Sequence, residues 1–140
     1  RLSTGSMVLD NTLLDLSKVK VPIYNLATRE DHIAPAESVL YGSRFFGGPV
    51  RYVLSGSGHI AGVINPPSLG KYQYWTNDAV GAATVSEWMK GAQEHKGSWW
   101  PDWHAWLRNI DAAEVPAREA GSAALPPIED APGSYVRVRA

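Results

Sequence analysis

The segment that decides the fold is residues 19–59, which read VKVPIYNLATREDHIAPAESVLYGSRFFGGPVRYVLSGSGH. Residues 19–27 and 50–54 are apolar and rich in β-branched side chains, which predicts two buried strands. Between them, residues 35–46 carry apolar side chains at helical spacing, and two glycines follow that end the helix. Roughly 10–12 helical residues between two apolar strands predict a strand–helix–strand unit with parallel strands.

The rest of the chain is less regular. A length of 140 residues suits one domain, and over residues 18–110 we expect an α/β architecture of parallel strands with flanking helices. Residues 1–17 are expected to form an irregular lead-in, and residues 111–140 a Pro/Ala-rich tail with a short edge strand at 135–139. Within the domain we expect a long loop over residues 60–83. A helix should follow that opens with the capping box of residues 84–87 and ends before Gly97, and another helix should start at Ser98.

Composition excludes several classes of protein. Hydrophobic residues make up 44% and charged residues 19% of the chain, which excludes a disordered tail. A formal net charge of −1 provides no basic excess for a nucleic-acid partner, and the chain has no run of about 18 apolar residues that would predict a transmembrane helix. The absence of cysteine excludes disulfides, zinc–thiolate sites, iron–sulfur clusters and a cysteine nucleophile within the chain.

An acid and an imidazole follow the two predicted strands. Asp31 lies just past the first strand, and His59 lies 28 residues later, just past the second. Because the carboxyl ends of parallel strands share one edge of the sheet, both side chains should meet there. In nucleophile–His–acid catalysis the acid orients the imidazole, and in α/β-hydrolase folds the order along the chain is nucleophile, acid, histidine. Asp31 and His59 are therefore our candidate catalytic residues.

Other interpretations of the polar residues stay open at this stage. Asp31 could shape a turn, and His59 could be an ordinary surface histidine. His32 is disfavoured as the base, because a residue adjacent to the acid usually cannot point back at it. His95 and His104 lack metal-ligand spacing and are expected to be surface or structural residues, so we assign no metal or cofactor site.

A nucleophile is missing from the chain. An α/β-hydrolase needs a Gly-x-Ser-x-Gly type of elbow upstream of the acid. The nearest string, SGSG at residues 55–58, has the wrong frame and lies beside His59. The chain also begins at Arg1 without an initiator methionine. We therefore expect it to start in the middle of a larger protein whose upstream part carries the nucleophile.

Four motifs carry a resemblance to a known family. They are REDHIAP at residues 29–35, SGHIAGVINPP at 57–67, YWTN at 74–77 and EHKGSWWPDW at 94–103. Over roughly residues 18–107, with a weaker echo at 131–136, the chain resembles the C-terminal end of class I poly(3-hydroxyalkanoate) synthases. These synthases have an α/β-hydrolase catalytic domain and a Cys-His-Asp triad. By motif, Asp31 and His59 resemble the triad acid and histidine, and the cysteine elbow would lie upstream.

The resemblance implies a function. The family polymerises (R)-3-hydroxyacyl-CoA thioesters into a storage polyester with release of CoA, so the CoA thioester is the substrate and no cofactor is expected. His59 would activate the upstream cysteine thiol, and either His59 or Asp31 would help the 3-hydroxyl of another unit to attack the acyl-enzyme. The chain alone, without the nucleophile, is expected to be inactive. The resemblance also implies a homodimer in the full-length protein and a cytoplasmic location at the surface of polyester granules.

Two alternatives to a synthase stay open. A polyester hydrolase (depolymerase) would use the same Asp31 and His59 with a serine elbow, and a non-catalytic module would dock on a granule through its aromatic helix. The indoles from Trp99 to Trp106 recur at helical spacing, which more often indicates core packing than a docking face. A Gly-x-Cys-x-Gly elbow in the upstream sequence would favour the synthase over both alternatives.

Overall fold

The computed structural model describes residues 1–79 and 81–139; Val80, in the expected loop of residues 60–83, and Ala140, at the end of the expected tail, lie outside the described residues. The chain divides into two units, Arg1–Ile110 and Asp111–Ala140. The first unit contains strands β1 (Val8–Leu9), β2 (Thr12–Leu13), β3 (Ile23–Thr28), β4 (Val50–Ser55), β5 (Gln73–Thr76) and β6 (Gln93–Lys96), and helices α1 (Ala36–Gly42), α2 (Val85–Met89) and α3 (Trp100–Ile110). Short 3-10 turns are η1 (Leu2–Thr4), η2 (Leu16–Lys18), η3 (Ser43–Phe45) and η4 (Pro67–Leu69).

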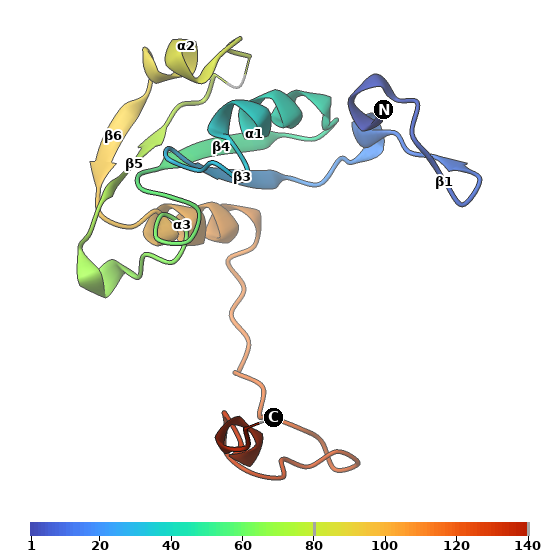
Figure 1. Ribbon diagram of the computed structural model, residues 1–140, viewed down its shortest axis with the longest axis vertical. Helices are drawn as coiled ribbons and strands as arrows, with labels where there is room; N and C mark the ends of the chain where they lie inside the picture. The colour runs from blue at the N-terminus through green and yellow to red at the C-terminus, as the bar shows by residue number, and fades with distance from the viewer. Residues whose placement is uncertain (80, 140) are drawn as a thin grey trace. The chain divides into compact units, whose positions relative to one another are not determined.

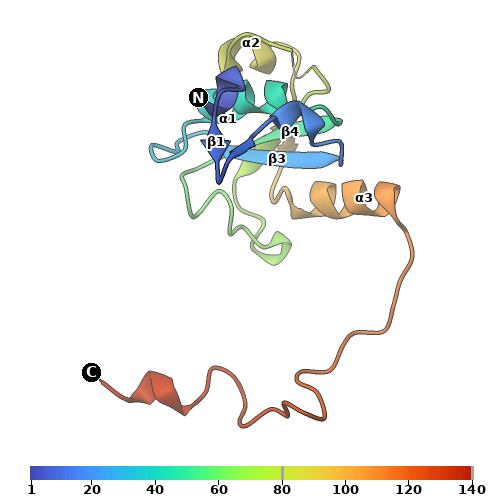
Figure 2. The same cartoon turned by 90° about the vertical axis from the view of Figure 1, so that its right-hand side faces the viewer.

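A four-stranded mixed sheet forms the centre of the first unit, in the order β3-β4-β5-β6. β3 and β4 are parallel and α1 connects them, which confirms the predicted strand–helix–strand unit. The expected arrangement of parallel strands holds for this pair and not for the rest of the sheet, because β5 and β6 run antiparallel to their neighbours. The connection from β4 to β5 carries the short 3-10 turn η4 and no α-helix, as an antiparallel pair needs no helical crossover. Figure 1 and Figure 2 show α1 on one face of β3 and β4, and α3 on the opposite face.

Two short strands replace a predicted loop and the end of a predicted helix. β5 lies inside the expected loop of residues 60–83, where four residues between turn-forming segments give too short a pattern to recognise. Thr84 caps α2 as predicted, since its hydroxyl accepts from the Glu87 backbone N–H at 3.1 Å. The helix expected to run on towards Gly97 nevertheless ends at Met89, and β6 follows. β6 reads Q-E-H-K, a polar sequence that suits the edge of a sheet.

The buried core lies on the α1 face of the sheet. Alternation along β4 sends Tyr52 and Leu54 to this face. Trp88 of α2 lies edge-on to the Tyr52 ring, with the centroids 4.9 Å apart, and Leu40 of α1 joins the same cluster. All four side chains belong to residues that are at most 1% exposed. Burial of this apolar surface fixes β4 in the interior and therefore fixes the end of the strand from which the His59 loop departs.

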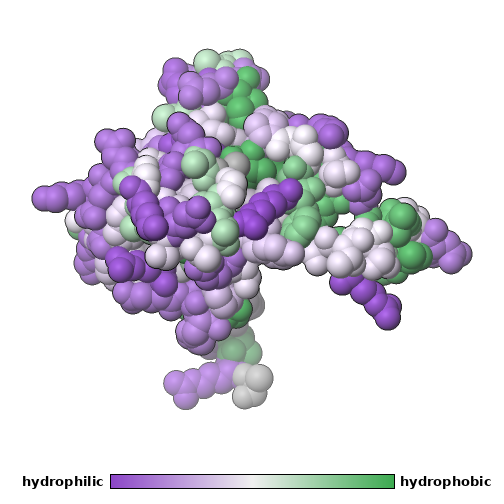
Figure 3. Space-filling view, turned by 90° about the horizontal axis from the view of Figure 1, so that it is seen from above, coloured by the Kyte–Doolittle hydropathy of each residue, from purple (hydrophilic) through white to green (hydrophobic). Residues whose placement is uncertain are grey.

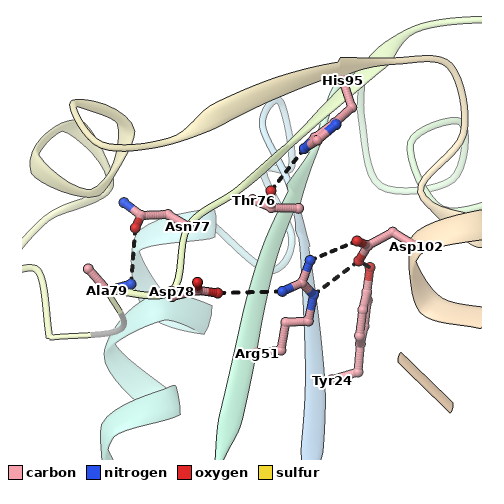
Figure 4. Close-up of polar contacts among 8 residues, drawn as sticks. All are labelled: Tyr24, Arg51, Thr76, Asn77, Asp78, Ala79, His95 and Asp102. Carbon is pink, nitrogen blue, oxygen red and sulfur yellow. Dashed lines mark hydrogen bonds and ion pairs between the residues drawn. The ribbon is translucent and has the colours of Figure 1, made fainter. Parts of the chain in front are cut away.

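A polar cluster holds α3 against the other face of the sheet (Figure 4). Asp102, in the first turn of α3, accepts from the Tyr24 hydroxyl at 2.8 Å and from Nη2 and Nε of Arg51 at 2.7 and 3.1 Å. Tyr24 and Arg51 are neighbours in the β3–β4 register, so the strand pair presents both donors to one carboxylate. Burial and the bond to Asp102 raise the pKa of Tyr24, and the bond to the same carboxylate raises the pKa of Arg51.

The N-terminal lead-in is more ordered than expected, because it contains the hairpin β1–β2. Its turn residues Asp10 and Asn11 both have positive φ, the geometry of a tight two-residue turn. Its strands carry apolar side chains that stay largely exposed, with Val8 at 60% and Leu9 at 62%. This apolar surface lies on the lobe that projects at the right of Figure 3.

The second unit has little regular structure. Its element is the 3-10 turn η5 (Ser134–Arg137), where Glu129 Oε1 accepts from the Ser134 backbone N–H at 2.8 Å. The edge strand expected at 135–139 is therefore wrong. A strand needs a neighbour to satisfy its backbone groups, and the described residues of this unit supply none. Across both units, none of the described helices is long and apolar enough to cross a membrane.

Candidate active site

The structure brings Asp31 and His59 together at the carboxyl ends of β3 and β4. The two strands end opposite each other in parallel register. The loops that follow are tied to one another, since the Glu30 backbone N–H donates to the Ser57 carbonyl at 3.0 Å. On these loops, Nδ1 of His59 lies 2.8 Å from Oδ2 of Asp31. The predicted juxtaposition of acid and imidazole is therefore present.

The loop after β3 keeps Asp31 ionised. Oδ1 accepts from the backbone N–H groups of Ile33 and Ala34 at 2.8 and 2.9 Å, and Oδ2 accepts from the Thr28 hydroxyl at 3.3 Å as well as contacting His59. The Asp31 side chain is 6% exposed. Burial alone would raise its pKa, but the hydrogen bonds from Ala34 above all, and from His59 and Ile33, hold the pKa of Asp31 well below its ordinary value.

The ionised Asp31 fixes the tautomer of His59. A carboxylate can only accept hydrogen bonds, so Nδ1 of His59 carries the proton in the 2.8 Å contact. Nε2 of the neutral ring then keeps its lone pair. The His59 side chain is 45% exposed, so the imidazole is accessible to a reacting group. An oriented imidazole with a free Nε2 is the form that takes a proton from a nucleophile.

The His59 loop folds back tightly onto the end of β3. The Ser55 hydroxyl, at the end of β4, donates to the Gly62 carbonyl at 2.8 Å. A Cβ added to Gly62 would lie 2.5 Å from the Gly56 carbonyl oxygen and 2.7 Å from the Thr28 methyl group. Only glycine allows this close approach. The packing of Gly62 on Thr28 therefore joins the loop that carries His59 to the strand that precedes Asp31.

The other histidines lie outside the pair. His32 is exposed, and its side chain makes no hydrogen bond or ion pair with any residue that the structure describes. The His95 ring stacks on Tyr74, with centroids 4.8 Å apart, and contacts the Thr76 hydroxyl at 2.9 Å. His104 is exposed on α3. In the described part of the chain, no group of three His, Cys, Asp or Glu side chains could hold a metal ion.

The indole stripe is packed only in part. Tyr24 of β3 contacts the rings of Trp99 and Trp106, with centroids 5.9 and 5.5 Å apart. Trp103 is 40% exposed, and no residue of α3 is fully buried. The predicted core packing therefore applies to the indoles that face the sheet and not to the whole stripe.

Two parts of the site were not predicted from the sequence. The backbone donors to Asp31 form an Asx-type turn, which an aspartate at the start of a loop could have indicated. The second part is a contact from α3, where Trp99 and Trp100 both donate an indole N–H to the carbonyl of Val63, at 3.2 and 3.0 Å. No periodicity or spacing links residues so far apart in the sequence.

Comparison with known proteins identifies relatives over the whole chain, although no protein-family model matches it. The chain is 60% identical over 140 residues to the poly(3-hydroxyalkanoate) polymerase subunit PhaC of Rhizobium meliloti (strain 1021), covering 100% of this chain and 23% of that protein. It is 55% identical over 140 residues to the poly(3-hydroxyalkanoate) polymerase of Methylorubrum extorquens, covering 99% of this chain and 23% of that protein. It is 43% identical over 137 residues to the PhaC subunit of Cupriavidus necator, covering 97% and 23% respectively.

The chain thus spans less than a quarter of the length of these relatives, at 23% of each. The matched part is their C-terminal part, as the motifs around Asp31 and His59 predict. Over its whole length, the chain is therefore homologous to the C-terminal part of the poly(3-hydroxyalkanoate) polymerases.

Proposed function

We propose that this chain supplies the acid and the base of a poly(3-hydroxyalkanoate) synthase, an acyltransferase that polymerises (R)-3-hydroxyacyl-CoA with release of CoA. The observation that carries the proposal is the 2.8 Å contact between Asp31 and His59 at the ends of two parallel strands. The names of the relatives support a polymerase in preference to a depolymerase or a non-catalytic module. The mixed sheet with helices on both faces is compatible with an α/β-hydrolase domain, which is part of the proposal.

In the acylation step, His59 acts on a cysteine in the part of the polymerase outside this chain. Nε2 takes the thiol proton, and the thiolate attacks the carbonyl carbon of the CoA thioester. The carbon–sulfur bond to CoA breaks, the CoA sulfur takes up the proton from the imidazolium, and an acyl-enzyme thioester remains. Asp31 stays ionised because its pKa is lowered, so it holds the ring and stabilises the imidazolium.

In the elongation step, the 3-hydroxyl of a second acyl unit attacks the acyl-enzyme thioester. A new ester bond forms, the bond to the cysteine sulfur breaks, and the hydroxyl proton returns to the sulfur through the base. We assign this proton transfer to His59. Both Asp31 oxygens already accept hydrogen bonds, and its lowered pKa makes Asp31 the weaker base.

The remaining partners in the proposal follow from the same reaction. The CoA thioester is the substrate, so the chemistry needs no cofactor. β3 lies at one end of the strand order, and no described strand pairs with its outer side. We expect a strand from the upstream part of the polymerase, which carries the cysteine, to pair there. A homodimer and a location at the surface of cytoplasmic polyester granules complete the proposal.

An isosteric change at the acid tests the proposal. In the full-length polymerase, Asp31→Asn keeps the shape of the side chain but removes the charge that orients His59. CoA release from 3-hydroxybutyryl-CoA should fall by a factor on the order of 10²–10⁴ in a variant that is still folded at the assay temperature. Glu30→Gln, which changes the exposed neighbouring carboxylate, is the matched control and should keep its activity. An Asp31→Asn enzyme within twofold of wild-type activity would contradict the proposal.

A further inference from the structure

The loop that carries His59 is held by two indoles from outside the site. Trp99 immediately precedes α3, and Trp100 is the first residue of the helix. Nε1 of each donates to the same acceptor, the carbonyl oxygen of Val63, at 3.2 and 3.0 Å. A carbonyl oxygen has two lone pairs, so the two indoles use its full capacity. Val63 lies only four residues beyond His59 in the same loop.

The indoles act from an anchored element. The start of α3 is tied to the sheet through Asp102, which binds Arg51 and Tyr24. The Trp99 ring also contacts the Tyr24 ring, with centroids 5.9 Å apart. The backbone N–H of Trp100 donates to the Ser98 hydroxyl at 3.1 Å, which satisfies one of the N–H groups that the first helical turn leaves without an intrahelical partner. Both donors are therefore presented to the loop by a fixed part of the fold.

Successive carbonyls of the loop are held by different elements. The Gly62 carbonyl accepts from the Ser55 hydroxyl at the end of β4, and the next carbonyl, that of Val63, accepts from the two indoles. Inside the loop, the Gly62 backbone N–H donates to the Gly58 carbonyl at 2.9 Å, and the Val63 and Ile64 backbone N–H groups donate to the Ile60 carbonyl at 3.1 and 2.8 Å. These overlapping turns link Val63 to the residues on either side of His59, so we expect a displacement of Val63 to move the imidazole.

We propose that Trp99 and Trp100 are positioning residues, which keep the His59 imidazole in place against Asp31 by fixing the Val63 carbonyl. The proposal deepens, and rests on, the function proposed for the pair. It also gives a role to the indole N–H groups of Trp99 and Trp100, which ring packing against the sheet does not explain. Misplacement of a catalytic group by about 1 Å costs on the order of 10²-fold in rate, so a contact remote from the chemistry can control it.

The test compares indole variants in the full-length polymerase. Trp99→Phe combined with Trp100→Phe removes both N–H donors, and replacing Trp100 by β-(3-benzothienyl)alanine removes one donor while keeping the bicyclic ring. Trp103→Phe is the matched control, since it keeps an aromatic ring beside Trp99 and since the Trp103 indole donates no hydrogen bond to the described residues. We expect the double variant to lower kcat for CoA release about 10- to 100-fold with KM within about twofold. Amide exchange over residues 60–64 should accelerate in parallel.

Two measurements together decide the outcome. A lower kcat with faster exchange in the double variant, a smaller change of the same kind with benzothienylalanine, and neither change in Trp103→Phe support the positioning role. Faster exchange with an unchanged kcat overturns it, and so does an equal loss of activity in Trp103→Phe. If His59→Gln is itself fully active, the proposed function fails and the positioning role fails with it. The exchange rates then show separately whether the indoles hold the loop.

Discussion

The anchor of α3 gives the sharpest quantitative prediction, because one arginine contacts two carboxylates in different surroundings. Asp102 has an 18% exposed side chain and lies 2.7 Å from Arg51 Nη2, while Asp78 has a fully exposed side chain and lies 3.6 Å from Nη1. Both contacts are drawn in Figure 4. We expect Asp102→Asn to loosen α3 strongly and Asp78→Asn to leave it almost unchanged.

The magnitude follows from exposure and from the number of bonds. A hydrogen bond to a charged group contributes about 1.5–3 kcal/mol, and breaking a fully buried ion pair costs about 3–5 kcal/mol. Asp102 accepts three bonds that are not additive, and Arg51 keeps some solvent contact, with a 27% exposed side chain. The free energy that docks α3 should therefore fall by about 2–3 kcal/mol in Asp102→Asn. The exposed Asp78 contact contributes little that can be measured.

Hydrogen exchange followed by mass spectrometry measures this docking without requiring reversible global unfolding. Each 1.4 kcal/mol changes an opening equilibrium tenfold, so α3 amides should exchange about 30- to 150-fold faster in full-length Asp102→Asn. In Asp78→Asn the same amides should stay within about twofold of wild type. Equal acceleration in the two variants, or acceleration below about threefold in Asp102→Asn, would refute the role of this cluster as the anchor.

Three further predictions follow from the site. Because the native pKa of Asp31 lies below its unfolded value of about 3.9, its contribution to stability is present above that pH and is lost as the pH falls towards the native pKa. Thermal unfolding of Asp31→Asn should therefore lose stability less steeply than wild type below about pH 4. Gly62→Ala should lower both the melting temperature and the activity, because the added Cβ has no room. Gly42→Ala in α1 should be neutral or slightly stabilising, because nothing lies near its added Cβ. A lower melting temperature in Gly42→Ala than in Gly62→Ala would contradict the packing described. The 140-residue chain alone should release no CoA from 3-hydroxybutyryl-CoA, and release that disappears on Asp31→Asn would count against a missing nucleophile.

The parts of the fold that could be predicted are those with a local cause. β3, α1 and β4 could be predicted because each has enough apolar residues at a clear period, and their spacing dictates parallel pairing. β5 and β6 could not, because each has only four residues and is defined by its pairing with a neighbour more than by its own pattern. The strand predicted at residues 135–139 was wrong for the opposite reason. The alternation there is a strand pattern, but no described strand pairs with it.

The same distinction separates the predictable from the unpredictable parts of the site. The meeting of Asp31 and His59 could be predicted from the sequence because the ends of parallel strands share one edge of the sheet. The hydroxyl of Thr28 and the indoles of Trp99 and Trp100 could not, because their contacts depend on how loops and α3 pack after the sheet has formed. The sequence motifs predicted the relatives of the chain, whereas the contacts that support Asp31 and His59 became visible only in the structure.

The central claim is that His59, and not the adjacent His32, is the base that Asp31 orients. The most direct measurement is CoA release by full-length His59→Gln beside full-length His32→Gln, with melting temperatures recorded for both. We predict that His59→Gln loses activity by a factor on the order of 10²–10⁴ while remaining folded, because its Nδ1 contact to Asp31 and its free Nε2 are both lost. His32→Gln should stay within a few-fold of wild type, since its side chain is exposed and makes no hydrogen bond or ion pair with the described residues. A folded but inactive His32→Gln beside a His59→Gln that retains most of its activity would contradict the assignment.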